Sequence, residues 1–142
     1  MKVVFDITQS LRHSGAAVLQ PVELTTPEAI TEMLERSRGA PVLLYKHSIS
    51  CPISGYAWYE VQDCLSCDEA SPVCYRVTVQ QQPQISRHLA ETLDVVHHTP
   101  QIIILRDAKA SYVASHWQIR RQSLQRALLN IGAESASNDE GY

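Results

Sequence analysis

The sequence lacks any long apolar stretch. Nowhere in its 142 residues does it contain the roughly eighteen consecutive apolar positions that indicate a membrane-spanning helix. The first residues, Met1 to Leu11, also lack the basic region and the following apolar run that mark a secretion signal. We therefore expect a soluble protein of the cytoplasm that has no membrane partner.

The sequence also lacks a strong excess of charge of one sign. Its 12 Lys and Arg residues stand against 15 Asp and Glu residues, which gives a formal net charge of -3. The excess lies in the segment 133–142, which has three acidic residues and no basic one, so the other 12 acidic residues balance the 12 basic ones. A nearly neutral body argues against a nucleic-acid partner, because such proteins usually present a basic face. The one basic cluster, Arg120, Arg121 and Arg126, is interpreted as a solvated helix face.

Cysteine is limited to four residues, at positions 51, 64, 67 and 74. In a short secreted chain an even number of cysteines would indicate a disulfide framework. Here a hydrophobic content of 44% is enough to bury the core of a single domain without disulfides. In a reducing cytosol the four thiols then indicate redox chemistry, metal binding or buried unreactive side chains.

Hydrophobic periodicity and turn residues predict that helices and strands alternate. A helix begins at Pro27, after the hydroxyl residues Thr25 and Thr26, and ends at Gly39. The other predicted elements, in chain order, are a strand over 42–46, a helix over 52–65, a strand over 73–79, a helix over 83–93, strands over 101–106 and 110–116, and a helix over 123–131.

This order implies an α/β fold. We expect a mixed central sheet with helices on both faces, and a C-terminal hairpin followed by a helix. The predicted organisation is an N-terminal extension over residues 1–20, one domain over 21–132 and a disordered acidic tail over 133–142.

Cys51 stands where a predicted strand gives way to a predicted helix. Polar residues separate it from the strand, and Pro52 is suited to the first helical position. A thiol is nucleophilic only as the thiolate, and the unpaired N–H groups and partial positive charge of a helix N-terminus favour that anion. Open α/β proteins also place their sites at the carboxyl ends of strands. Cys51 is therefore the candidate nucleophile.

The residues around Cys51 are polar. Ser50 precedes it, and Ser54 can turn its hydroxyl back toward the sulfur. Lys46 and His47 can add positive charge nearby. The alternative is that Cys51 is a small apolar filler, since free cysteine is often buried. Filler cysteines prefer apolar neighbours, so we interpret Cys51 as functional.

Three short stretches together carry a family resemblance. They are Lys46-His47-Ser48, Ser50-Cys51-Pro52-Ile53-Ser54, and Thr99-Pro100-Gln101 before an apolar strand. This combination resembles the monothiol bacilliredoxins, thioredoxin-like proteins of the bacillithiol redox system, from about Pro41 to about Leu128. The resemblance implies a thioredoxin-like fold and a thiol-disulfide oxidoreductase activity.

The resemblance also implies roles for single residues. Cys51 would attack a mixed disulfide between a protein thiol and bacillithiol, and Ser54 would occupy the place of the second cysteine of dithiol relatives. Pro100 would be a cis-proline facing the thiol, and Thr99 would offer its backbone to an extended substrate. No metal or organic cofactor would be needed. The partners would be S-thiolated proteins, the low-molecular-weight thiol as co-substrate and a disulfide reductase.

Further residues are predicted to surround the thiol. Trp117 stands where thioredoxin-like proteins tend to have a glycine, so its ring would narrow the substrate groove. His97 and His98 directly precede Thr99 and can assist proton transfer, although solvated loop histidines remain the simpler interpretation. The six histidines show no HxH or HExxH spacing that would indicate a metal site.

The other three cysteines leave alternatives open. Cys64 and Cys67 lie three residues apart near the end of a predicted helix, where a disulfide would require the last turn to unwind. A zinc-binding module at Cys64, Cys67 and Cys74 is one alternative function, with unreactive thiols as the default. A second alternative is a non-catalytic thioredoxin-like adaptor domain that binds a peptide beside Pro100.

Overall fold

A computed structural model of the chain describes residues 20–66 and 71–140. Cys67 and nearly all of the expected N-terminal extension lie outside these described residues. Within the described ranges no helix is both long enough and apolar enough to cross a membrane.

The centre of the molecule is a mixed five-stranded sheet with the strand order β1-β3-β2-β4-β5. The first three strands in that order are parallel to one another, and β4 and β5 form an antiparallel hairpin next to β2. The bounds are β1 Val22–Glu23, β2 Val42–His47, β3 Cys74–Thr78, β4 Gln101–Arg106 and β5 Lys109–Ser115. The expected mixed α/β sheet with a C-terminal hairpin is confirmed.

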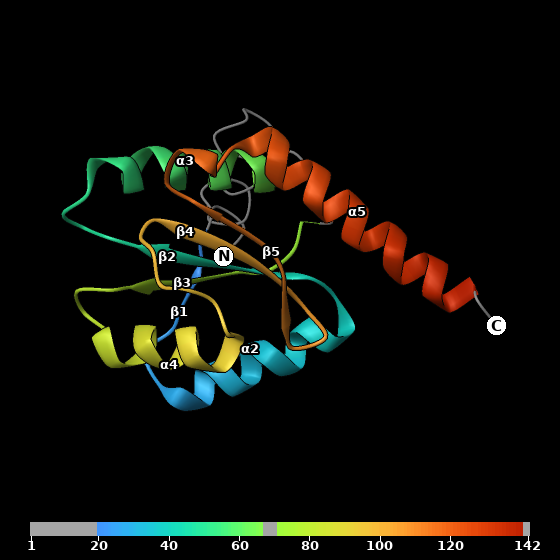
Figure 1. Ribbon diagram of the computed structural model, residues 1–142, viewed down its shortest axis with the longest axis horizontal. Helices are drawn as coiled ribbons and strands as arrows, with labels where there is room; N and C mark the ends of the chain where they lie inside the picture. The colour runs from blue at the N-terminus through green and yellow to red at the C-terminus, as the bar shows by residue number, and fades with distance from the viewer. Residues whose placement is uncertain (1–19, 67–70, 141–142) are drawn as a thin grey trace, which may run out of the picture.

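Helices cover both faces of this sheet. In Figure 1, α3 and α5 lie above the sheet, and α2 and α4 lie below it. Their bounds are α2 Pro27–Gly39, α3 Pro52–Ser66, α4 Pro83–Leu93 and α5 Arg121–Glu140, with a short 3-10 helix, η1, at His116–Gln118.

The alternation of side chains along β2 divides the interior into two cores. Leu43 and Tyr45 pack with α3 and α5, whereas Val42 and Leu44 pack with α2 and α4. All four side chains are buried, which explains why β2 reads as one continuous apolar run rather than an alternating one.

Prolines at the first helical position set the start of three helices, α2, α3 and α4. The N-cap of α2 is Thr26, whose Oγ1 accepts a hydrogen bond from the Ala29 N–H at 3.2 Å. The predicted hydroxyl cap before Pro27 is thus present, and α2 ends at Gly39 as expected.

The last helix is longer than expected. The sequence predicts that Gly132 ends it, but α5 continues to Glu140, through most of the segment expected to be a disordered tail. One glycine inside a helix costs only about 1 kcal/mol relative to alanine, and Ala133, Glu134 and Ala136 are strong helix formers. In Figure 1 the last turns of α5 project beyond the sheet.

Four loops meet at one edge of the sheet. Lys46 pairs with Gln101 in the antiparallel β2–β4 ladder, so the residues after β2 and those before β4 lie together. His47 pairs with Thr78, and Gln101 also pairs with Ser115, which brings the ends of β3 and β5 to the same place. We call this the Cys51 edge and define it as residues 48–51, 79–82, 95–100 and 116–118.

Candidate active site

Cys51 lies at the start of α3 and is partly exposed. It forms no disulfide, and its carbonyl oxygen accepts a hydrogen bond from the Ser54 N–H at 3.0 Å. The first turn of α3 contains no acidic residue that would oppose a negative charge on the sulfur. Cys51 therefore stands at a helix N-terminus, with no carboxylate of the first turn beside it.

The loop before Cys51 is held by a side chain that the sequence did not single out. Gln80, which follows β3, donates from Nε2 to Ser48 Oγ at 2.6 Å and to Ser50 Oγ at 3.1 Å. Its Oε1 accepts the Ile49 N–H at 3.1 Å. Gln80 belongs to a run of three glutamines without any motif, so only the long-range pairing of β2 with β3 could have identified it.

Ser54 is completely buried beneath Cys51 in the first turn of α3. Its Oγ accepts the Ser48 N–H at 3.1 Å, and its carbonyl oxygen accepts the Tyr45 hydroxyl at 2.7 Å. These two bonds join the start of α3 to the end of β2 and to the loop before Cys51. The described contacts include no hydrogen bond from Ser54 to the sulfur, and the hydroxyl hydrogen of Ser54 has no acceptor among them.

Lys46 and His47 lie on opposite faces of β2, although they are adjacent in the sequence. Lys46 follows Val42 and Leu44 on the side of α2 and α4, and it is buried. Its Nζ donates to Gln101 Oε1 at 3.0 Å, and burial lowers the pKa of its ammonium group to about 8. Lys46 thus lies across the sheet from α3 rather than beside Cys51.

His47 lies on the α3 side, with its ring centroid 5.7 Å from that of Tyr45. Burial, together with the charge of Arg76, lowers the pKa of the imidazole, while Glu23 acts in the opposite direction. Its Nδ1 is buried and has no hydrogen-bond partner among the described residues. The ring is therefore neutral at pH 7 and adds no positive charge to the site.

The Thr99-Pro100 peptide bond is cis, as the resemblance implies. Pro100 is buried and Thr99 is partly exposed at the Cys51 edge. The Pro100 carbonyl oxygen accepts the His116 N–H at 2.9 Å, which joins this turn to the loop after β5. The ring of His98 packs edge-on against that of His116, with centroids 5.6 Å apart.

Trp117 is exposed in η1 and borders the start of α3. Its ring lies 6.0 Å from that of Tyr56, and both rings line a cavity of about 230 Å³ that also includes Ile53. Ile49 is a further exposed apolar residue in the loop before Cys51. Exposed apolar and aromatic side chains therefore occur both in the loop before Cys51 and along the first two turns of α3 and η1.

The other described cysteines are buried. Burial raises the pKa of the Cys74 thiol to about 12, so this thiol stays protonated and unreactive near pH 7. Cys64 is buried on α3, and Cys67 lies outside the described residues. Among the residues that the structure describes, no group of three or more His, Cys, Asp or Glu side chains is arranged to hold a metal ion.

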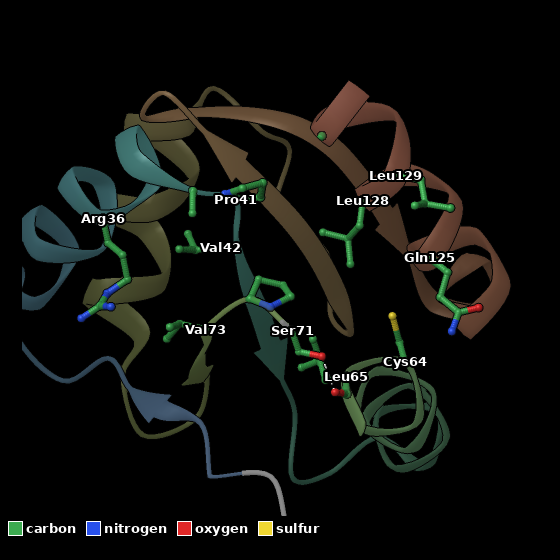
Figure 2. A pocket seen from close by; sticks show the side chains of 13 residues that line it. Arg36, Pro41, Val42, Cys64, Leu65, Ser71, Val73, Gln125, Leu128 and Leu129 are labelled. Carbon is green, nitrogen blue, oxygen red and sulfur yellow. Dashed lines mark hydrogen bonds between the residues drawn. The ribbon is translucent and has the colours of Figure 1, made fainter. Parts of the chain in front are cut away.

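A larger cavity, of about 700 Å³, opens at the opposite edge of the sheet. Figure 2 shows Val42, at the start of β2, and Val73, just before β3, facing a space that is also bordered by Leu128 of α5 and Cys64 of α3. Cys51 lies at the other end of β2 and α3. This cavity is therefore separate from the thiol site.

Comparison with known proteins agrees with this arrangement. The family model for monothiol bacilliredoxin BrxC matches residues 22–124, which include Cys51 and the Thr99-Pro100 turn. A solved structure described as an oxidoreductase with a thioredoxin fold is 26% identical, with a TM-score of 0.68, and the match covers 75% of this chain and 92% of that one.

More distant structures show the same fold. The thioredoxin of Trypanosoma brucei brucei is 13% identical, with a TM-score of 0.62 and coverage of 79% of this chain and 90% of its own. The thioredoxin of Fasciola hepatica is 14% identical, with a TM-score of 0.62 and coverage of 77% and 97%. The fold is that of thioredoxin, and because the family model spans most of the sequence, the chain belongs to the monothiol bacilliredoxin family.

Proposed function

We propose that the protein is a monothiol thiol-disulfide oxidoreductase that removes bacillithiol, or a similar low-molecular-weight thiol, from mixed disulfides on proteins. The observation that carries this proposal is the pairing of a partly exposed Cys51 at the start of α3 with a buried serine, Ser54, in the first turn of that helix. One cysteine at this position can accept an adduct, and serine cannot expel it.

The first step is a thiol-disulfide exchange. The Cys51 thiolate attacks the sulfur of the small thiol in the mixed disulfide, and a new disulfide forms between Cys51 and the small thiol. The bond to the target protein breaks, and the target cysteine leaves as a thiolate that takes up a proton from water. One disulfide is consumed and one is formed, so no external electron donor is needed.

Release of the small thiol needs a second molecule. Cys64 is thirteen residues from Cys51, and α3 is continuous from Pro52 to Ser66, so the two lie about 20 Å apart along the helix. A disulfide requires Cα atoms within about 7 Å. A free small thiol therefore attacks the Cys51 adduct, which yields the Cys51 thiolate and a small-molecule disulfide that a separate reductase reduces.

Ser54 supports the reactive form of Cys51. Its Oγ already accepts the Ser48 N–H, so the hydroxyl hydrogen is the part of this buried group that is left to donate. A buried hydroxyl gains stability when its hydrogen finds an acceptor, and the thiolate supplies one.

The surroundings of Cys51 suit an extended protein substrate. Thr99 is partly exposed in the turn before β4, at the Cys51 edge, where its backbone can pair with an extended chain, and the exposed side chains of Ile49, Tyr56 and Trp117 offer apolar contacts. We place this exchange in the cytoplasm, where thiols are kept reduced and mixed disulfides are transient.

The proposal is tested by intact mass spectrometry of the protein after incubation with oxidised low-molecular-weight thiols. We expect a single adduct, mapped by peptide digestion to Cys51, which disappears in Cys51→Ser. Adducts on Cys64, Cys67 or Cys74 instead, or no adduct at all, would contradict the proposal. Protein alkylated at Cys51 beforehand is the matched control.

A further inference from the structure

Lys46 is an unusual residue for the interior of a protein. It is 1% exposed, and none of the ion pairs among the described residues involves it. Burying an ammonium group without a counter-ion is costly, so such a residue is rarely retained for stability alone. Its one described hydrogen bond is that from Nζ to Gln101 Oε1, at 3.0 Å.

Gln101 is equally buried and uses its whole side-chain amide. Its Nε2 donates to the Val96 carbonyl oxygen at 3.0 Å and to Ser115 Oγ at 3.2 Å, while Oε1 accepts from Lys46. A lysine ammonium has three donors and no acceptor, so only the oxygen end of the amide can face it. Lys46 therefore fixes which way the Gln101 amide points.

One acceptor of Gln101 lies in a loop of the Cys51 edge, and the other directly precedes a second loop of that edge. Val96 lies in the segment 95–100, which leads to the Thr99-Pro100 turn. Ser115 ends β5 and directly precedes η1, which carries Trp117. The His116 N–H to Pro100 carbonyl bond joins the same two loops at the backbone. A single buried amide thus spans both loops that border the substrate side of the thiol.

We infer that Lys46 is a positioning residue, which orients the Gln101 amide and thereby holds the segment 95–100 and the η1 turn together as the recognition surface for the target protein. The expected effect on substrate binding rests on the proposed function. The ordering of the two loops by Lys46 and Gln101 rests on the hydrogen bonds alone. Lys46 acts from the α2 and α4 side of the sheet, so it sets how the substrate is bound rather than how reactive the thiolate is.

Lys46→Met tests the inference, because methionine is also unbranched and only one heavy atom shorter, and it removes the donor. We expect the KM for a protein mixed disulfide to rise about tenfold, the effect of losing one buried hydrogen bond. The rate at which iodoacetamide alkylates Cys51 should not change. Lys109→Met, which alters an exposed lysine of β5, is the matched control.

A second variant removes the hydrogen bonds that Gln101 donates and leaves the charge of Lys46 in place. Gln101→Glu keeps an acceptor for Lys46 and removes both donors, so it should raise the KM as Lys46→Met does.

A third measurement does not depend on enzymatic activity. Amide hydrogen exchange of the His116 N–H, which bonds to Pro100, should be faster in both variants than in the wild type.

These readouts distinguish the two proposals. If the wild type performs no exchange, the proposed function fails, yet the hydrogen exchange of His116 still tests the positioning role. Unchanged KM and unchanged His116 exchange in Lys46→Met would overturn the inference. The inference would also be overturned if Lys46→Met lowered the rate of Cys51 alkylation by iodoacetamide as much as it lowered the rate of thiol-disulfide exchange. That result would mean that Lys46 affects the reactivity of the Cys51 thiolate rather than the binding of the substrate.

Discussion

Ser54 is the residue that makes this a one-cysteine site. Its N–H bonds to the Cys51 carbonyl oxygen, so residues 51 and 54 are held across the first turn of α3. Its hydroxyl and its carbonyl are both engaged with the end of β2 and the loop after it. A sulfur atom at residue 54 would therefore be held in the first turn beneath Cys51.

Ser54→Cys should convert the site into a dithiol. Mild oxidation is expected to join the new thiol to Cys51, and intact mass should show the loss of two hydrogens. Gly55→Cys is the control, since a Cβ at Gly55 meets no atom within 4 Å and the side chain is exposed on the next position of the helix. No bond in Ser54→Cys, or equal bonding in both variants, would mean that Cys51 does not cap α3 as described.

At the scale of elements, the two faces of β2 carry different ionisable side chains. The α3 face presents Tyr45 and His47 toward the start of α3, and the other face buries Lys46. Burial lowers the pKa of Lys46 to about 8, whereas a lysine in the unfolded chain has its ordinary pKa of 10.5. Folding therefore favours the neutral, deprotonated form of Lys46.

This linkage predicts that the contribution of Lys46 to the free energy of unfolding increases at alkaline pH. Between about pH 8 and pH 10.5 the unfolded chain holds the Lys46 proton and the folded chain does not, so the free energy of unfolding gains a contribution that rises with pH. The neighbouring His97 has a lowered pKa and is already neutral in this range. Cys74 acts in the opposite sense, since burial raises its pKa from 9.0 to about 12.

The measurement is urea denaturation of the wild type and of Lys46→Met at several pH values from 7 to 10.5. Because Cys74 is present in both proteins, the difference between them isolates Lys46. The wild type should gain stability relative to Lys46→Met as the pH rises. A difference that stays constant over this range would show that Lys46 is not desolvated in the fold.

Several elements could be predicted from the sequence because their signals are local. The apolar run of β2, Pro52 before the stripe of α3, and the proline starts of α2 and α4 each act within a few residues. Strand β1 has only two residues and η1 has three, too few to show any periodicity. The extra turns of α5 do not follow from local signals, because Gly132 indicates a helix end while the alanines after it favour continuation.

The site divides in the same way between local and long-range signals. The positions of Cys51, Pro52 and Ser54 relative to α3 follow from the sequence. The contacts of Gln80 and Gln101 depend on which strands are neighbours, and no spacing along the chain reveals them. The sequence predicts positive charge near Cys51 from both Lys46 and His47, but adjacent residues of a strand point to opposite faces, so only His47 shares the face of α3.

At the scale of the whole molecule, the thiol and the larger cavity lie at opposite edges of one sheet. The Cys51 edge is formed by four separate connections, which hydrogen bonds join in two pairs: those of Gln80 join 79–82 to 48–51, and those of Gln101 and His116 join 95–100 to the end of β5 and η1. The account of function therefore depends on a single reactive atom, the sulfur of Cys51, in a preformed setting.

The most direct test of that claim uses a target protein that carries a low-molecular-weight thiol as a mixed disulfide. The measurement is the rate at which the small thiol is removed from the target protein. We compare wild type, Cys51→Ser and the control Cys64→Ala, each with free small thiol present. The wild type and Cys64→Ala should accelerate release, and Cys51→Ser should leave the rate at that of the small thiol alone. Release by Cys51→Ser at the wild-type rate would contradict the account.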